Sequence, residues 1–248
     1  MQSKILPAHI PHFLTGLNMA DNRVALNGDL SLRTVVDPQT MDWTPSPGGH
    51  VLRKRLHRVG QSESGQVTSL VRYEPRATFP AHDHPLGEEI LVLEGVFSDE
   101  HGDWPAGSYL LNPEGFKHAP FSHEGCLLFV KLRQYPGPDR EHVAIATHNK
   151  PWQPSIRKNT SWKKLYAQEP YTDFMRLESW DEPSAIGQIN FPQGAEILVL
   201  RGSFADEHGH YSTHCWLRIP AGGTVNPISD DYCELYIKEG GFTYLRSA

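Results

Sequence analysis

The 248-residue sequence is poor in cysteine and has no extended basic tract, and both shortages limit what the protein can be. Its three cysteines form no CxxC pair, and an odd number does not suit a disulfide framework. The longest run of Lys and Arg is the tripeptide that starts at Arg53, and the formal net charge is −6. The sequence therefore carries no electrostatic footprint for binding nucleic acid or an anionic membrane surface.

Long apolar runs are also absent. No stretch approaches the ~20 residues that a membrane-spanning helix needs. The first residues, MQSKILPAHIPHF, lack the apolar core of a secretory signal. From these absences we expect a soluble, cytoplasmic protein whose thiols stay reduced.

Short β-type runs are what the sequence has instead. Stretches such as 67–73 and 127–132 are rich in branched and aromatic residues, and 20 prolines and 21 glycines punctuate the chain. This texture is typical of an antiparallel sandwich or barrel. Helical periodicity is scarce, and residues 12–17 are the one short helix that we expect.

An internal repeat organises the chain. Residues 89–131 align without a gap on residues 196–238, and 19 of the 43 positions are identical. The same domain therefore occurs twice, and each copy is long enough to bury its own core. We expect an N-terminal arm over residues 1–30, a first domain over 31–135, a linker over 136–149 and a second domain over 150–248.

The repeat also serves as an internal control. Features that both copies keep are expected to serve the fold, whereas features that only one copy keeps are expected to serve function. Four polar residues of the first copy are apolar in the second: His82 aligns with Ile189, His84 with Phe191, Glu88 with Ala195 and His118 with Val225.

These four residues form a recognisable pattern. His82, His84 and Glu88 make an HxHxxxE motif, and a GxxxxxPxGxxH motif runs from Gly107 to His118. The two motifs, in this order, resemble the signature of the cupin superfamily. The resemblance implies two tandem antiparallel β-barrels of the jelly-roll kind and a metal site made by the four residues. Alternation along a strand independently places both histidines of the first motif on one side.

The donor set limits the metal. Imidazole and carboxylate ligands suit one divalent ion per chain, with Zn or Fe(II) expected first and Mn or Ni as alternatives. The second barrel, which lacks all four ligands, is expected to bind none.

Other polar residues are assigned to structure. Glu89 is next to a predicted ligand, but alternation points it away from the site, and its equivalent Glu196 persists in the second copy. His101 and His208 belong to Asp-Glu-His-Gly turns that both copies keep. We expect surface or loop positions for His50, His57, His123, His142, His148, His210 and His214. Cys126 and Cys233 are expected to be small core residues.

The segment GEEILVLEGVFSDEHGDWPAGSYLLNPEGFKHAPFSHEGCLLFVKL more specifically resembles the ChrR-like cupins. That family takes its name from an anti-sigma factor whose separate N-terminal domain binds zinc through an HxxxCxxC-type site. Nothing in this sequence matches that domain, because no cysteine precedes Cys126. We therefore expect no binding to a sigma factor.

Three functions remain open at this point. The resemblance implies iron-dependent dioxygenases that cleave carbon–carbon bonds in small diketones and hydroxyketones as one possibility. A metal-dependent sensor of a small ligand and a regulator that contacts a protein partner are the others. Six side chains are expected to line the mouth or wall of the barrel: Arg72, Tyr73, Phe79, Tyr109, Phe116 and Phe129.

We also expect a homodimer. Tandem barrels leave strand edges that another chain can cover by exchanging an arm.

Overall fold

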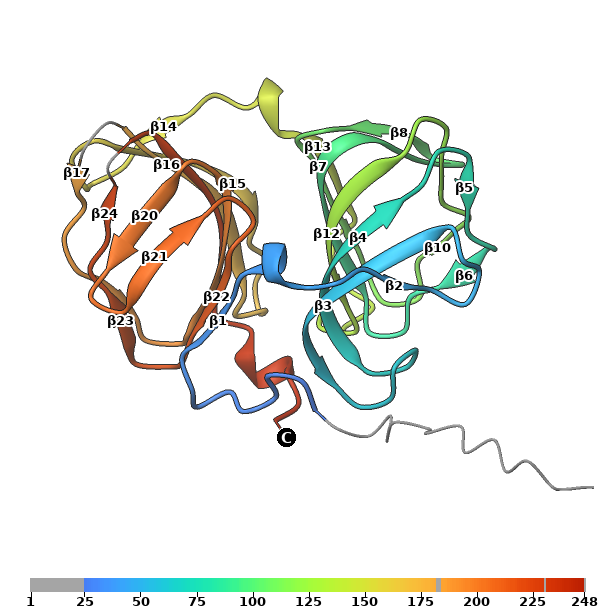
Figure 1. The fold of residues 1–248 in the computed structure, drawn as a ribbon, viewed down its shortest axis with the longest axis horizontal. Coiled ribbons are helices and arrows are strands. Elements are labelled where there is room, and N and C mark those ends of the chain that lie inside the picture. The colour runs from blue at the N-terminus through green and yellow to red at the C-terminus, as the bar shows by residue number, and fades with distance from the viewer. Residues whose placement is uncertain (1–24, 182–183, 230, 248) are drawn as a thin grey trace, which may run out of the picture.

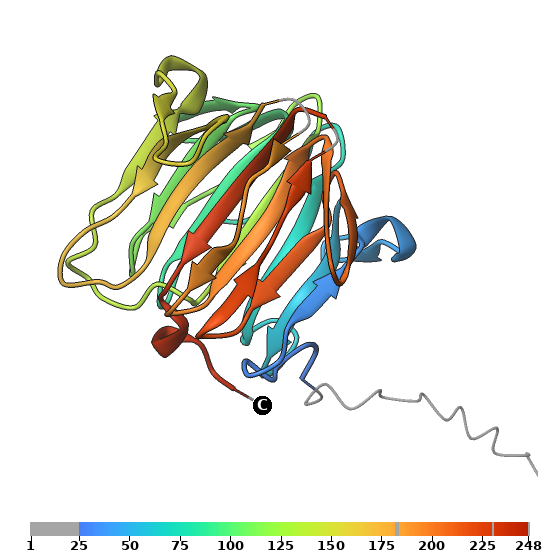
Figure 2. The same cartoon turned by 90° about the vertical axis from the view of Figure 1, so that its left-hand side faces the viewer.

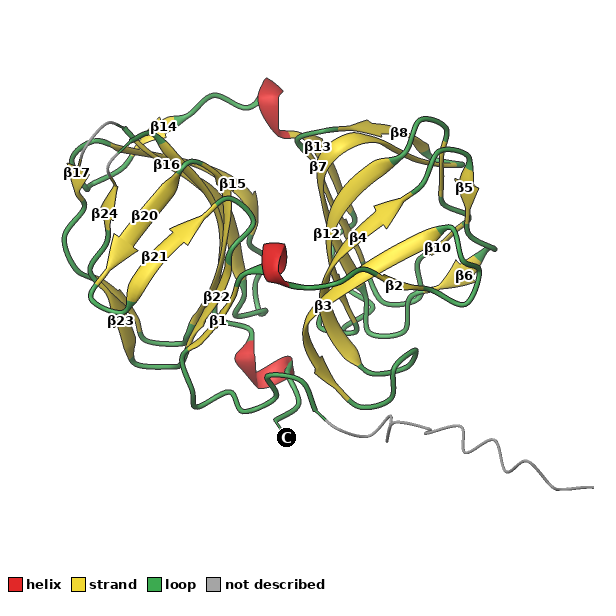
Figure 3. Cartoon of the chain, viewed as in Figure 1, coloured by secondary structure: helices red, strands yellow, loops and turns green. Residues whose placement is uncertain are grey.

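The computed structural model describes residues 25–181, 184–229 and 231–247, and it is built almost entirely of β-strands (Figures 1 and 3). The described residues contain no α-helix, only three one-turn 3-10 helices: η1 (Pro38–Thr40), η2 (Thr147–Asn149) and η3 (Phe242–Tyr244). None of these is long enough to span a membrane. The helix expected over 12–17 and most of the expected arm lie outside the described residues.

The first barrel has one long sheet of seven consecutive strands. In sheet order these are β13 (Val143–Ala146), β9 (Ser108–Asn112), β7 (Glu88–Asp99), β12 (Cys126–Leu132), β4 (Gln66–Tyr73), β3 (Val51–Val59) and β2 (Thr44–Pro45). The opposite wall is made by short strands: β5 (Ala77–Thr78), β6 (His82–Asp83), β8 (Gly102–Pro105), β10 (Lys117–His118) and β11 (Phe121–Ser122).

The second barrel repeats the strand order of the long sheet. Its long sheet has the order β1 (Thr34–Val36), β22 (Trp216–Ile219), β19 (Ala195–Arg201), β25 (Cys233–Glu239), β16 (Phe174–Trp180), β15 (Thr160–Tyr166) and β14 (Gln153–Pro154). Its opposite wall consists of β17 (Ser184–Ala185), β18 (Ile189–Phe191), β20 (Ser203–Asp206), β21 (Gly209–Ser212), β23 (Gly223–Val225) and β24 (Ile228–Ser229). The expected tandem cupin architecture is confirmed.

The repeats exchange their first strands. Strand β1 precedes the first barrel in sequence, yet it pairs with β22 of the second barrel. Strand β13 opens the second repeat, lies within the segment 136–149 expected as a linker, and pairs with β9 of the first barrel. Each barrel therefore contains one strand from the other repeat.

The long sheets of the two barrels pack against each other, as the two views in Figures 1 and 2 show. Their central strands are buried on both faces, which is why β12 is apolar along most of its length and β7 contains the run ILVL. Three cores result: one inside each barrel and one between the sheets.

Buried polar groups tie the two sheets together. Glu89 points away from the first lumen, as alternation predicted, but it is 1% exposed because it faces the second barrel and not solvent. It accepts hydrogen bonds from the hydroxyls of Tyr109 (2.8 Å), Tyr236 (2.7 Å) and Tyr135. Its repeat partner Glu196 pairs with Lys131. The two glutamates, which occupy equivalent positions in the repeats, thus serve the interface between the barrels.

His57 corrects one expectation. It was expected at the surface, but it lies on β3 at 1% exposure, in the region where the barrels meet. Burial lowers the pKa of His57 to about 4, and the nearby charges of Glu196, Arg218, Lys131 and Lys238 partly offset one another. The imidazole is therefore neutral at pH 7.

Candidate metal centre

Two short strands bring the predicted ligands together. Strands β6 and β10 pair with His82 opposite His118. His84 follows β6 and is fixed by its backbone N–H, which donates to the Phe116 carbonyl at 3.0 Å. Glu88 opens β7 on the neighbouring sheet. The four residues, which are up to 36 positions apart in sequence, thus face one region of the first lumen.

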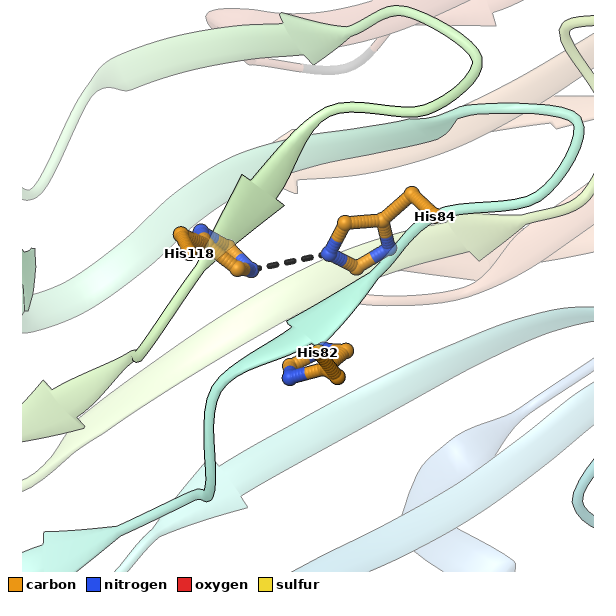
Figure 4. Close-up of side chains that lie close together, drawn as sticks. All are labelled: His82, His84 and His118. Carbon is orange, nitrogen blue, oxygen red and sulfur yellow. Dashed lines mark hydrogen bonds between the residues drawn. The ribbon is translucent and has the colours of Figure 1, made fainter.

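The three imidazoles converge on one point (Figure 4). Their potential ligand atoms all lie within 4.8 Å of one another, and Nε2 of His84 is 2.9 Å from Nε2 of His118. One Glu88 oxygen, Oε2, lies 3.3 Å from the first of these nitrogens and 3.6 Å from the second.

These separations suit a shared metal ion. Ligand atoms that each lie ~2.0–2.1 Å from a zinc-sized ion, at angles between square and tetrahedral, are about 2.9–3.4 Å apart. The His84, His118 and Glu88 atoms lie close to that range, whereas two buried imidazoles, a half-buried one and a buried carboxylate without a metal would be costly to keep together. The residues present therefore fit a divalent cation.

Neighbouring groups orient each donor. Nδ1 of His82 is 2.8 Å from the Pro80 carbonyl oxygen, which can only accept, so this nitrogen carries the proton and Nε2 has a free lone pair. Nδ1 of His118 is 3.1 Å from Oδ2 of Asp99. The amide of Asn112 donates to Oε2 of Glu88 at 2.9 Å. Such contacts fix ring tautomers and carboxylate orientation in metal sites.

The surroundings shift the pKa values of the four candidate ligands. Burial lowers the pKa of His84 to about 3 and also lowers that of His82, so both rings stay neutral at pH 7. Burial raises the pKa of Glu88 to about 7. Burial opposes protonation of His118 too, but its hydrogen bond to Asp99 and the charge of Glu88 outweigh this and raise its pKa. A cation in the site would displace protons from these last two groups.

A cavity of about 260 Å³ opens onto the histidine cluster. Its buried wall is mainly apolar, with side chains from β4, β7 and β12, and its partly exposed rim is polar. This volume lies near the low end for small-molecule sites, so the cavity suits a small organic ligand.

The six side chains expected to line the cavity occupy different places in the structure. Tyr73 and Phe79 line the cavity. Tyr109 and Phe129 belong to the core between the barrels, because their strands turn these positions toward the second sheet. Arg72 is exposed and its guanidinium lies 4.4 Å from the centre of the Trp43 ring.

Phe116 has a different place. It packs edge-on against the ring of His118, with centroids 5.8 Å apart, and it stacks on His142 at 4.7 Å. It supports a histidine of the cluster.

The same positions in the second barrel are occupied by apolar side chains. Ile189 pairs with Val225 in the register of His82 and His118. These two residues, Phe191 and Ala195 belong to one buried apolar cluster and are each at most 3% exposed. Within residues 25–181, 184–229 and 231–247, the first-barrel histidines form the one group of metal-type side chains found.

Sequence comparison missed two supporting residues. Asn112, which orients Glu88, aligns with Ile219, so the contrast between repeats could have revealed it. Asp99 could not be found that way, because its equivalent Asp206 is retained. Both aspartates accept turn N–H groups, and Asp206 also pairs with Arg33.

Comparison with known proteins agrees with this structure. A sequence model described as the ChrR Cupin-like domain matches twice, over residues 31–136 and 140–243. The chain belongs to this family. The ChrR-like assignment is therefore confirmed, and both repeats of this ChrR-like cupin are recognised. A search of the curated proteins finds no match at a significant level.

Solved structures share the fold. A putative dioxygenase from Nostoc punctiforme is 16% identical with a TM-score of 0.69, and the match covers 86% of this chain and 84% of that one. A bacterial pirin from Escherichia coli in complex with nickel(II) is 12% identical with a TM-score of 0.62, covering 84% and 99%. An oxalate decarboxylase mutant from Bacillus subtilis is 13% identical with a TM-score of 0.58, covering 84% and 77%. At these identities the similarity supports the fold alone.

Proposed function

We propose that the first barrel binds one divalent metal ion through His82, His84, Glu88 and His118, and that this centre acts on a small organic molecule as a dioxygenase. The convergence of three imidazoles and a carboxylate at the base of a small cavity carries the proposal. Similarity to a putative dioxygenase and to a nickel-bound pirin supports it at the level of the fold.

The bound metal would supply a Lewis acid for substrate oxygens and, as Fe(II), electrons for O₂ chemistry. The protein's own side chains do the remaining work. Asp99 and the Pro80 carbonyl hold two imidazoles in one tautomer, and Asn112 holds the Glu88 carboxylate. The apolar wall excludes water from the reacting groups and strengthens electrostatic interactions there.

Tyr73 contributes a neutral hydroxyl to the cavity. Burial raises the pKa of this phenol well above its ordinary value, and the nearby Glu88 carboxylate acts in the same direction. The hydroxyl therefore stays protonated and can donate a hydrogen bond to a ligand oxygen.

Anaerobic purification followed by metal analysis tests the metal site. We expect at most one tightly held divalent ion per chain, with Fe(II) or Zn(II) dominant. Two ions per chain would contradict the assignment, because the second barrel would then bind metal as well.

Oxygen uptake tests the activity. The Fe(II)-loaded protein is mixed with pentane-2,4-dione and with a set of 2-oxo acids, and O₂ consumption is followed by electrode. Uptake with any of them supports a dioxygenase. Metal-dependent ligand binding without uptake would instead favour the sensory function.

A further inference from the structure

Arginine side chains mark the rim of the metal cavity. Arg53, Arg55 and Arg133 all line it, together with the acidic residues Glu63 and Asp83. Glu63 bonds to two of the arginines: it is 2.8 Å from Nη1 of Arg53 and 3.1 Å from Nη2 of Arg55. One carboxylate thus serves two guanidinium groups.

The guanidinium of Arg133 is different. Among the described residues it has no ion pair and no hydrogen bond, although the residue is half-buried and lines the cavity. Burial lowers the pKa of Arg133, while the nearby charges of Glu63 and Asp83 act in the opposite direction. Its charge also acts on His82 and His84, where it opposes ring protonation. This guanidinium, which has no direct partner among the described residues, therefore lies near the histidine cluster.

The repeat provides a second observation on the same residue. Arg133 has φ +60°, in the left-handed region that favours glycine, and its equivalent in the second barrel is Gly240 with φ +70°. The backbone bond is the same in both copies: Arg133 N–H donates to the Gly87 carbonyl at 2.9 Å, and Gly240 N–H donates to the Gly194 carbonyl at 3.0 Å.

The contrast between the two copies concerns backbone strain at this position. An L side chain at positive φ is strained, and the second copy avoids that strain with glycine. The strained arginine occurs in the barrel that has the histidine cluster and the cavity. Strain of this kind is more frequent at functional sites than elsewhere. Strain alone is not decisive, because Arg76 also has φ +65° although it lies away from the cavity.

We propose that Arg133 binds the carboxylate of a small organic acid whose apolar body lies against the cavity wall and whose other oxygens face the histidine cluster. This inference rests on the proposed function and names its substrate class. A guanidinium offers a fork of N–H donors that matches a carboxylate and gives strong charge-assisted hydrogen bonds. The aliphatic wall, which includes Val71, Ile90 and Leu128, suits a short branched chain.

Calorimetric titration of the Zn(II)-loaded full chain tests the proposal, because Zn(II) is redox-inert and prevents turnover. The probes are 4-methyl-2-oxopentanoate, which has a carboxylate, and pentane-2,4-dione, which has none. Arg133→Gly should weaken binding of the acid at least tenfold, the size expected when charge-assisted hydrogen bonds are lost. Binding of the dione should change less than twofold, and metal content should not change.

Arg76→Gly is the matched control, since it removes an arginine from the same backbone conformation outside the cavity. It should bind both probes as the original protein does. The proposal is overturned if Arg133→Gly weakens binding of both probes equally or weakens binding of neither. It is also overturned if the original protein does not bind the acid.

Failure of the metal site would appear separately. If the original protein holds no metal even after Zn(II) addition, the proposed function fails. The carboxylate site is then tested in the metal-free protein. There Arg133→Gly must still weaken binding of the acid and leave binding of the dione unchanged.

Discussion

The two barrels share a fold but differ in what their interiors contain. In the first, His82 and His118 pair across β6 and β10; in the second, Ile189 and Val225 occupy the same register on β18 and β23. The backbone frame is therefore independent of the ligands. The difference shows that this jelly-roll forms around an apolar interior as well as around a polar one, although a buried polar cluster is costly to the fold.

The largest effect should come from removing two histidines of the cluster. In His84→Ala/His118→Ala we expect metal affinity to fall more than about 100-fold, since even loss of a supporting contact costs ~10–100-fold. Mass spectrometry of the purified protein measures occupancy, and circular dichroism checks the fold. Glu89→Gln is the control, because Glu89 faces the other barrel, and it should keep its metal.

Equivalent positions in the two barrels should differ in their effect on stability. Phe191→Ala should lower the free energy of unfolding by about 3–5 kcal/mol, because it opens a void in a packed core. His84→Ala in the metal-free protein should cost less than about 1 kcal/mol, because the removed ring borders an existing cavity. Urea unfolding of both variants gives the comparison. Equal losses would show that the His84 ring is a packing residue.

The turn aspartates sharpen the contrast further. Asp99→Asn should weaken metal binding by ~10–100-fold, because Asn at this position cannot provide the carboxylate charge that stabilises the His118 ring. Asp206→Asn, at the same turn in the second barrel, should leave metal affinity unchanged. Competition with a chelator measures both. A similar loss in the two variants would place the effect in the turn and not in the site.

The smallest effect concerns the pH dependence of stability, through His57 at the interface between the barrels. The folded-state pKa of His57, about 4, lies below the unfolded value of ~6.5, so its contribution to stability is complete above pH 6.5 and is lost as the pH falls toward 4. At pH 5 the loss should be about 2 kcal/mol. His57→Gln should flatten this slope when urea unfolding is followed from pH 7 to 5. An unchanged slope would show that other groups control acid stability.

The histidine cluster was predictable from sequence because the chain contains the same domain twice. Residues His82, His84, Glu88 and His118 have apolar equivalents in the second copy, so the fold itself does not require them. The same comparison fails where both repeats keep a residue. Glu89 and Glu196 both serve the interface, so nothing in the alignment shows that they are buried between barrels.

The exchange of strands between the repeats could not be predicted from sequence for a related reason. Strands β1 and β13 occupy equivalent places in the two repeats, and alternation along a strand does not specify which sheet it joins. Pairing depends on where the preceding segment lies in space. His57 was missed in the same way, since a lone histidine on a strand gives no indication that a second sheet covers it.

The exchange of β1 and β13 also determines when each barrel can be completed during synthesis. Thr34 must meet Arg218, its partner 184 residues further along the chain. At ~5–20 residues per second, β1 waits roughly ten to forty seconds on the ribosome before its place in the second barrel exists. The first barrel is also incomplete until β13, the first strand of the second repeat, emerges. The gene thus encodes two domains, but neither is finished before the other has begun.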